Sequence, residues 1–299
     1  MAPITRFGRS LSLFQNRFTT RLRRSTRWVR DRRRVRLAAP PATRVEIRHV
    51  GHGVVELRLS AGERRNVLGR STISAIEEFV ANPPASTRVI VITGEPPDFC
   101  AGYDFVEASN SEPLDLVAHE SNFAVLRESR IPIIAALQGN VIGGGLELAL
   151  SADIRIASPE VRLAVPASKL GLVYSEAGIR LVVDAMGQSL ARAMFLAGLV
   201  LDGEAALSAG VVSEMVGREQ LRERALATAT EMASWSEAAS SGNRQILDHV
   251  AGRVVVDANE LHVQSFARDG QLRRTIHDFV TRRATISKAP HVERTPPGE

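Results

Sequence analysis

Short apolar runs that each lead into a glycine-containing turn are the feature that most constrains this chain. The run Val89–Ile92 consists of β-branched residues and is bounded by turn residues, which is typical of a strand buried on both faces. Similar runs occur at Ile133–Leu137 and Asp153–Ala157, and stretches of helical character separate them. Strands that alternate with helices predict an α/β fold of stacked ββα-like units with parallel strands, rather than an all-helical or all-β domain.

Further elements are expected before and after these runs. Apolar residues alternate with polar ones, or follow one another, in the segments Val45–Val50 and Val54–Leu59. Two glycines lie between these segments, so we expect a β-hairpin. A helix should follow from Ser71, a good N-cap residue, and end at Pro83-Pro84. A long polar helix is expected over about 113–130.

Charge and composition divide the chain into four segments. Residues 1–43 hold twelve arginines and one acid, a charge of +11, whereas the whole chain carries +5 and the remainder therefore −6. We interpret 1–43 as a disordered arginine-rich extension; an amphipathic helix for an anionic surface or an organelle-targeting segment is the alternative. Residues 44–187 are expected to form the α/β core, 188–285 a helical oligomerisation region, and 286–299 a tail. Nearly everything after about residue 177 reads as helical, including 221–233 and 256–280.

Several classes of protein are disfavoured. The acidic body does not resemble a nucleic-acid-binding domain, so RNA binding would have to depend on the arginine-rich extension. No apolar run approaches the ~18 residues of a membrane-spanning helix and no secretory signal is evident, so a cytoplasmic protein is expected. Cys100 is the single cysteine and the seven histidines lack ligand spacing, so we expect no disulfide, no metal and a buried, unreactive thiol.

Two glycine turns carry the chemistry that the sequence suggests. Phe99–Phe105 (FCAGYDF) follows the strand that ends near Thr93, and Gln138–Glu147 (QGNVIGGGLE) follows the Ile133–Leu137 strand and opens a helix. Such turns, at the ends of neighbouring parallel strands, can each point a backbone N–H into one crevice, the second at the positive end of a helix. This geometry would form an oxyanion hole.

These two turns, with Arg65-Asn66-Val67-Leu68 upstream, resemble the crotonase (enoyl-CoA hydratase/isomerase) superfamily over roughly residues 44–285. The resemblance implies a crotonase-type spiral of ββα units with an all-helical C-terminal region, assembled as trimers or dimers of trimers. It also implies an acyl-CoA thioester substrate that is stabilised as an enolate. Coenzyme A would be part of the substrate, and no tightly bound cofactor is expected.

The resemblance also assigns roles to residues. The amides of Tyr103 and Gly144 would be the oxyanion donors, and Glu147 would be the first of the two catalytic glutamates of the hydratases. A carboxylate in the first turn of a helix can also be present only because it interacts favourably with the helix dipole. The apolar neighbours of Glu147 instead favour a partly buried general acid or base. The coenzyme A would contact a second set of residues: Arg64, Arg65, Ala101, Tyr103 and Asp104.

One departure from the hydratase pattern leaves the reaction open. Ala167 follows Pro166 where hydratases carry their second glutamate, and Tyr174 matches a tyrosine of the methylmalonyl-CoA decarboxylase branch. Loss of carbon dioxide generates an enolate without a base, so Tyr174 would orient the leaving carboxylate or relay a proton, and Glu147 or Glu176 would protonate the enolate. Glu176 as a surface charge, and a non-catalytic acyl-CoA-binding protein, are the alternatives.

Overall fold

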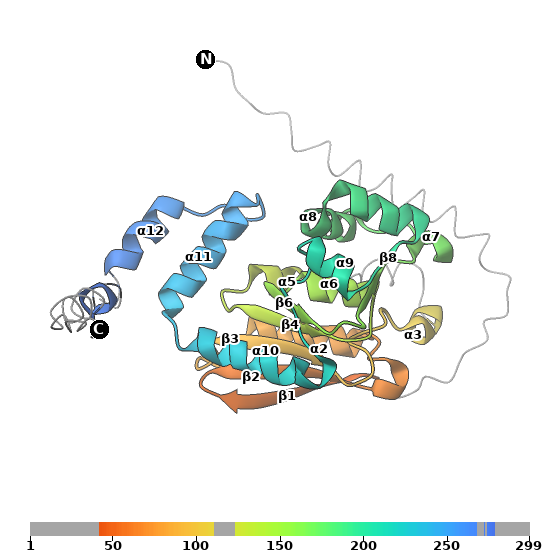
Figure 1. Ribbon diagram of the computed structural model, residues 1–299, viewed down its shortest axis with the longest axis horizontal. Coiled ribbons are helices and arrows are strands. Elements are labelled where there is room, and N and C mark those ends of the chain that lie inside the picture. Colours follow the sequence, from red (N-terminus) through yellow and green to blue (C-terminus); the bar gives the residue numbers. More distant parts are fainter. Residues whose placement is uncertain (1–41, 111–122, 268–271, 273, 279–299) are drawn as a thin grey trace, which may run out of the picture.

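The computed structural model describes residues 42–110, 123–267, 272 and 274–278 (Figure 1). The strands are β1 (Arg44–Gly51), β2 (Val54–Ser60), β3 (Val89–Gly94), β4 (Ile133–Leu137), β5 (Asn140–Ile142), β6 (Ile154–Ala157), β7 (Arg162–Ala164), β8 (Val200–Leu201) and β9 (Glu214–Met215). The α-helices are α2 (Arg70–Ala81), α3 (Phe105–Asn110), α5 (Ala124–Glu128), α6 (Gly144–Leu150), α7 (Ala167–Leu170), α8 (Glu176–Arg192), α9 (Gly203–Ser208), α10 (Arg218–Ala233), α11 (Glu237–Val250) and α12 (Ala258–Ala267). A 3-10 helix, η2 (Gly62–Arg64), and a π-helix, η3 (Ala193–Ala197), complete the helical elements of the described residues.

The main sheet has the strand order β1-β2-β3-β4-β6-β9. Strand β1 pairs with β2 in an antiparallel hairpin, and every other neighbouring pair is parallel. All residues of β3 and β4 are buried, as their continuous apolar sequences predict. The predicted α/β fold with parallel strands is therefore confirmed.

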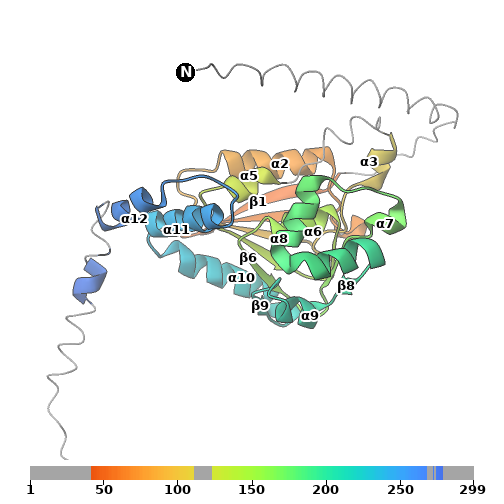
Figure 2. The same cartoon turned by 90° about the horizontal axis from the view of Figure 1, so that it is seen from above.

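Helices cover both faces of the main sheet. Figure 2 shows α2 and α5 on one side and α10 on the other. Side chains alternate along β3, so Ile90 and Ile92 join the core under α2, whereas Val89 and Val91 pack against α10. The two glycine turns follow the carboxyl ends of β3 and β4.

A second, small sheet was not predicted. It has the order β5-β7-β8, with β5 and β7 parallel and β7 and β8 antiparallel. Strands of two or three residues show too little alternation for a sequence pattern to reveal them. The expectation that nearly everything beyond residue 177 is helical was also incomplete, because β8 and β9 lie there.

The N-cap predicted for α2 was wrong. The helix begins at Arg70, with Gly69 in the N-cap position, and Ser71 lies inside the first turn. The carboxylate of Glu107 accepts hydrogen bonds from the Arg70 N–H at 3.2 and 3.3 Å, so a residue distant in sequence caps this helix.

The predicted helix over 113–130 is only partly described. Residues 111–122 lie outside the described part, and α5 covers Ala124–Glu128 alone. The helix does not reach residue 130, because the Ser129 hydroxyl accepts the Ile131 N–H at 3.0 Å in a local turn.

The C-terminal helices follow the expected pattern as far as the structure describes them. Helices α11 and α12 contact each other, and α12 extends beyond the α/β core (Figure 1). The structure does not describe the tail 286–299 or the extension 1–43, except for the last two residues of that extension. The division of the chain at residue 187 stays a prediction. Residues 188–285 also complete the core, because β9 joins the main sheet and α10 covers it.

In the described part of the chain, no helix has the length and apolarity needed to cross a membrane.

Candidate active site

The two glycine turns predicted to carry the chemistry lie side by side. The Cys100 N–H donates to the Asn140 carbonyl at 3.0 Å, and the Ile142 N–H donates to the Cys100 carbonyl at 3.0 Å. A methyl group on Gly102, whose φ is +99°, would lie 2.8 Å from the Ile142 oxygen and 3.8 Å from the Gly144 nitrogen. Only glycine permits both this backbone conformation and this close approach. The turn containing Tyr103 therefore faces the start of α6.

The Gly144 amide lies at the start of α6, beside the turn that contains Gly102 and Tyr103. Gly144 is the first residue of α6, where the N–H groups have no partner within the helix. Among the residues that the structure describes, none accepts the Gly144 N–H. The ring of Tyr103 packs on the same glycine, because an added methyl group would lie 2.7 to 2.9 Å from three ring atoms. The motif assigns only the amide of Tyr103, so this role of its ring was missed.

Glu147 lies in the first turn of α6, and its side chain is buried, as predicted. The residue is 3% exposed, and every residue of α6 is buried. A carboxylate in such a place needs polar or charged neighbours. Burial lowers the pKa of Arg127 of α5, and the charge of Glu147 acts in the opposite direction on it. Arg127 was not predicted from the sequence, in which strands β4 and β5 separate it from Glu147.

Tyr174 is brought to the same turn. Its hydroxyl oxygen lies 3.5 Å from the position of a methyl group added to Gly143, directly before the Gly144 amide. Its ring meets the ring of Phe195 edge to face, with centroids 5.2 Å apart. Tyr174 is thus held with its hydroxyl at the start of α6.

Ala167 and Glu176 differ sharply in burial. Ala167 is 4% exposed and begins α7. The Glu176 side chain is 87% exposed and pairs with Arg180 at 3.1 Å on the surface of α8. The structure therefore supports the interpretation of Glu176 as a surface charge.

The residues assigned to coenzyme A lie on adjoining loops. The Ala101 N–H donates to the Arg65 carbonyl at 2.9 Å, which ties the loop after β2 to the first glycine turn. Arg64 Nη2 donates to Asp104 Oδ2 at 2.7 Å, whereas the Arg65 side chain is 63% exposed. Burial alone would raise the pKa of Asp104, but the hydrogen bond from Arg64 and two backbone amides hold it below its usual value.

Asp98 braces the two turns and was not singled out from the sequence. It is 3% exposed, and its Oδ1 accepts both the backbone N–H and the side-chain amide of Asn140 at 2.7 Å. Asn66, also buried, donates to the carbonyls of Glu95 and Asp98 at 2.7 and 2.9 Å. A polar residue two positions before the Cys-Ala-Gly turn is the only sequence signal for this link.

Cys100 lies beneath the turn and is fully buried. Burial raises the pKa of its thiol to about 12, and the Sγ accepts the Gly102 N–H at 3.4 Å. A thiol in this state is a poor nucleophile, as expected from the sequence.

Comparisons with known proteins agree with the fold and the turns. The sequence pattern of the enoyl-CoA hydratase/isomerase family matches residues 49–285. A Mycobacterium leprae protein described as a probable enoyl-CoA hydratase is 34% identical over 169 residues, which cover 54% of this chain and 68% of the relative. Human mitochondrial methylglutaconyl-CoA hydratase is 30% identical over 199 residues, which cover 63% of this chain and 59% of that protein, less than two thirds of its length.

Solved structures show the same architecture. The crystal structure of an enoyl-CoA hydratase/isomerase family protein from Hyphomonas neptunium superposes with a TM-score of 0.73 at 25% identity, covering 80% of this chain and 95% of the other. An enoyl-CoA hydratase subunit from Geobacillus kaustophilus gives the same TM-score at 24% identity and shares the fold. The chain therefore belongs to the enoyl-CoA hydratase/isomerase (crotonase) family.

Proposed function

We propose that this protein transforms an acyl-CoA thioester through an enolate, with the amides of Tyr103 and Gly144 as oxyanion donors and Glu147 as the proton-transfer group. The observation that carries the proposal is the Gly144 N–H, which starts a buried helix, lacks an acceptor among the described residues and faces the turn of Tyr103. Donors that are fixed before the reaction stabilise developing negative charge without reorganisation.

In this mechanism the thioester oxygen binds between the two amides. For water addition to a 2-enoyl-CoA, the Glu147 carboxylate takes a proton from water as the water oxygen bonds to the β-carbon. The electron pair of the double bond then moves toward the thioester oxygen. Glu147 returns the proton to the α-carbon, which restores the carboxylate. One glutamate thus completes a balanced hydration although position 167 is alanine. The hydratase names of the relatives support this reaction.

The coenzyme A portion would lie along the loops that carry Arg65 and Ala101. The exposed guanidinium of Arg65 suits a phosphate, and Arg64 would contribute its charge from the Asp104 pair. Coenzyme A enters as part of the substrate, without a tightly bound cofactor. The proposed assembly is a trimer or a dimer of trimers. Exposed apolar side chains on the C-terminal helices, among them Leu247 at 70% and Val263 at 64%, support an interface between copies there.

Decarboxylation of a methylmalonyl-CoA-type substrate is the second candidate. The observation that favours it is the Tyr174 hydroxyl at the Gly143 turn, together with a buried alanine at position 167. Breaking the carbon–carbon bond releases carbon dioxide and leaves the electron pair as the thioester enolate. A proton then reaches the α-carbon from Glu147 or through Tyr174. An alanine at position 167 places no carboxylate charge against the leaving group.

A turnover screen by mass spectrometry tests both reactions. Purified protein is incubated with crotonyl-CoA, a longer 2-enoyl-CoA and methylmalonyl-CoA, beside the variants Glu147→Gln, Tyr174→Phe and Glu176→Gln. Loss of a general acid or base costs about 10²- to 10⁴-fold, so hydration should fall by this factor in Glu147→Gln and stay unchanged in Glu176→Gln. Carbon dioxide release that depends on Tyr174 would select the decarboxylase. Binding of coenzyme A thioesters without any product would refute catalysis and favour a binding protein.

A further inference from the structure

The loop between β2 and α2 contains two consecutive residues in the left-handed region of φ, although neither is glycine. They are Arg65 and Asn66, with φ values of +55° and +53°. This conformation is unfavourable for residues that carry a side chain, although asparagine tolerates it better than most. It persists only where the surrounding structure holds it. The contacts that hold this loop come from the side chain of Asn66.

The Asn66 side chain is fully buried and uses both of its polar atoms. Its Oδ1 accepts the Ala61 N–H at 2.9 Å. Its Nδ2 donates to the carbonyls of Glu95 and Asp98 at 2.7 and 2.9 Å. Only a primary amide offers an acceptor and two donors side by side at the end of a side chain. Asn66 therefore fastens the start of its own loop to the loop that follows β3.

The residues after Asn66 pair with the first glycine turn. The Leu68 N–H donates to the Gly102 carbonyl at 2.8 Å, and the Leu68 carbonyl accepts the Asp104 N–H at 2.9 Å. These two bonds form a parallel β-bridge between Leu68 and Tyr103. Leu68 is 2% exposed and packs in the hydrophobic core, so it cannot easily shift. It thus fixes the backbone on both sides of Tyr103.

This bridge determines the direction of the Tyr103 amide. In a parallel bridge, the residue between the two bonded neighbours directs its own N–H and carbonyl to the opposite side. Leu68 bonds to both chain neighbours of Tyr103, so the Tyr103 N–H points away from Leu68. The opposite side of the turn pairs with the second glycine turn, because Cys100 bridges Val141 there. The Tyr103 N–H therefore points to the side on which Gly144 begins α6.

We propose that Asn66 is a positioning residue for the oxyanion hole. It holds the loop that, through Leu68, directs the Tyr103 amide toward the position of the thioester oxygen. This inference rests on the proposed role of the Tyr103 and Gly144 amides as oxyanion donors. Donors stabilise developing charge most when their direction is fixed before the reaction. Because its side chain is fully buried, Asn66 does not touch the substrate and acts through the backbone.

Three variants remove the bonds of Asn66 in different ways. Asn66→Gly keeps the left-handed conformation but loses the side chain, and Asn66→Ala disfavours that conformation as well. Asn66→Asp keeps the shape and one acceptor oxygen but loses the amide donors, so it serves as the test if the other two do not fold.

The kinetic test uses whichever substrate the screen identifies. Removal of an oxyanion donor lowers kcat about 10²- to 10³-fold, and a misdirected donor retains part of its effect. The kcat of each Asn66 variant should therefore fall about 10- to 10²-fold. KM should change less than about threefold, because Asn66 does not bind substrate. Wild-type kcat in a folded variant would overturn the proposal.

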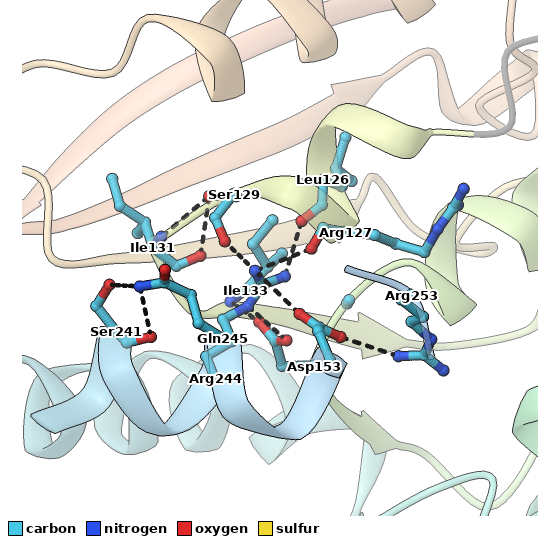
Figure 3. Close-up of polar contacts among 12 residues, drawn as sticks. Leu126, Arg127, Ser129, Ile131, Ile133, Asp153, Ser241, Arg244, Gln245 and Arg253 are labelled. Carbon is cyan, nitrogen blue, oxygen red and sulfur yellow. Dashed lines mark hydrogen bonds and ion pairs between the residues drawn. The ribbon is translucent and has the colours of Figure 1, made fainter. Parts of the chain in front are cut away.

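Two controls separate this role from a loss of stability. His52 is exposed and has a φ of +52° in the β1–β2 turn, at the amino end of the sheet, so His52→Ala introduces a left-handed alanine away from the site. Arg244 of α11 is buried and donates to the carbonyls of Leu126 and Arg127 and to the carboxylate of Asp153 (Figure 3). Arg244→Lys keeps the charge but loses this fork of bonds. Both controls should keep wild-type kcat, and an equal fall of kcat in Arg244→Lys would overturn the proposal.

A second measurement needs no turnover. Butyryl-CoA with a ¹³C-labelled thioester carbonyl is bound at saturation and observed by infrared difference spectroscopy. Two aligned donors weaken the carbonyl double bond and lower its stretching frequency. The wild type and both controls should show this lowering, and the Asn66 variants at most about half of it, because only the Gly144 amide stays aligned. The wild-type frequency in the folded Asn66 variants would refute the inference.

The same spectra distinguish the inference from the proposed function. A lowering that is lost in the Asn66 variants, in a protein that turns over no acyl-CoA, would keep the positioning role and refute the proposed catalysis. An unshifted carbonyl in the wild type would overturn both, because the two amides would then not bind the thioester oxygen.

Discussion

Replacing Asp98 by alanine should weaken the link between the two glycine turns. The change removes the oxygen that accepts both the backbone N–H and the side-chain amide of Asn140, each at 2.7 Å. A hydrogen bond to a charged group contributes about 1.5 to 3 kcal/mol, so two such bonds suggest about 3 to 6 kcal/mol. Water can reach the half-buried Asn140, so we expect a loss of about 3 kcal/mol in the free energy of unfolding. This is a large share of the ~5 to 15 kcal/mol of an ordinary domain.

The measurement is urea unfolding, compared with Asp202→Ala as a matched control. Asp202 also accepts a backbone N–H, from Ala205 at 2.9 Å, but only as an exposed helix N-cap. Losing such a cap costs about 1 kcal/mol. Asp98→Asn, which keeps one acceptor oxygen, should fall between Asp98→Ala and the wild type.

Turnover provides the second readout for the same variants. Misplacement of reacting groups by about 1 Å can lower the reaction rate about 10²-fold. The kcat/KM of Asp98→Ala should therefore fall at least about tenfold, whereas Asp202→Ala should keep wild-type activity. Equal unfolding free energies for the two alanine variants, or an Asp98→Ala protein with full activity, would show that Asp98 does not brace the site.

Two further predictions concern buried titratable groups. Burial alone would raise the pKa of Glu56, but hydrogen bonds from Arg222 and Thr93 hold it below the usual 4.5. The ionised Glu56 therefore stabilises the fold above about pH 4.5, and this stabilisation is lost as the pH falls through the lowered pKa. Arg222→Ala should lower the free energy of unfolding by about 3 kcal/mol at pH 7 and by less at pH 4, as measured by urea unfolding. The same loss at both pH values would contradict this account. Because burial raises the pKa of Cys100 to about 12, iodoacetamide at pH 8 should label this thiol slowly in the folded protein and rapidly in urea, as followed by mass spectrometry. Rapid labelling of the folded protein would exclude a buried thiol.

Local sequence was sufficient for the elements whose pattern is long enough to be read. The strand runs at Val89–Ile92 and Ile133–Leu137 are continuous and apolar, and both are central, fully buried strands. The glycine-opened helix after residue 143 was likewise expected, and it begins at Gly144. The cap of α2 was not predictable, because its acceptor is Glu107, which lies 37 residues beyond Arg70.

By itself, the sequence determined the α/β alternation, the two glycine turns, and the placement of Glu147 in the first turn of a buried helix, because these depend on residue type and short spacing. Only the tertiary structure decided which charged groups surround them: Asp98 on Asn140, Arg64 on Asp104, and Arg127 along the helix of Glu147. Each of these contacts joins segments 24 to 42 residues apart, and arginines and acids are frequent in this chain. Which of them meet depends on how the strands and helices pack, because a charged side chain carries no periodic signal of its partner.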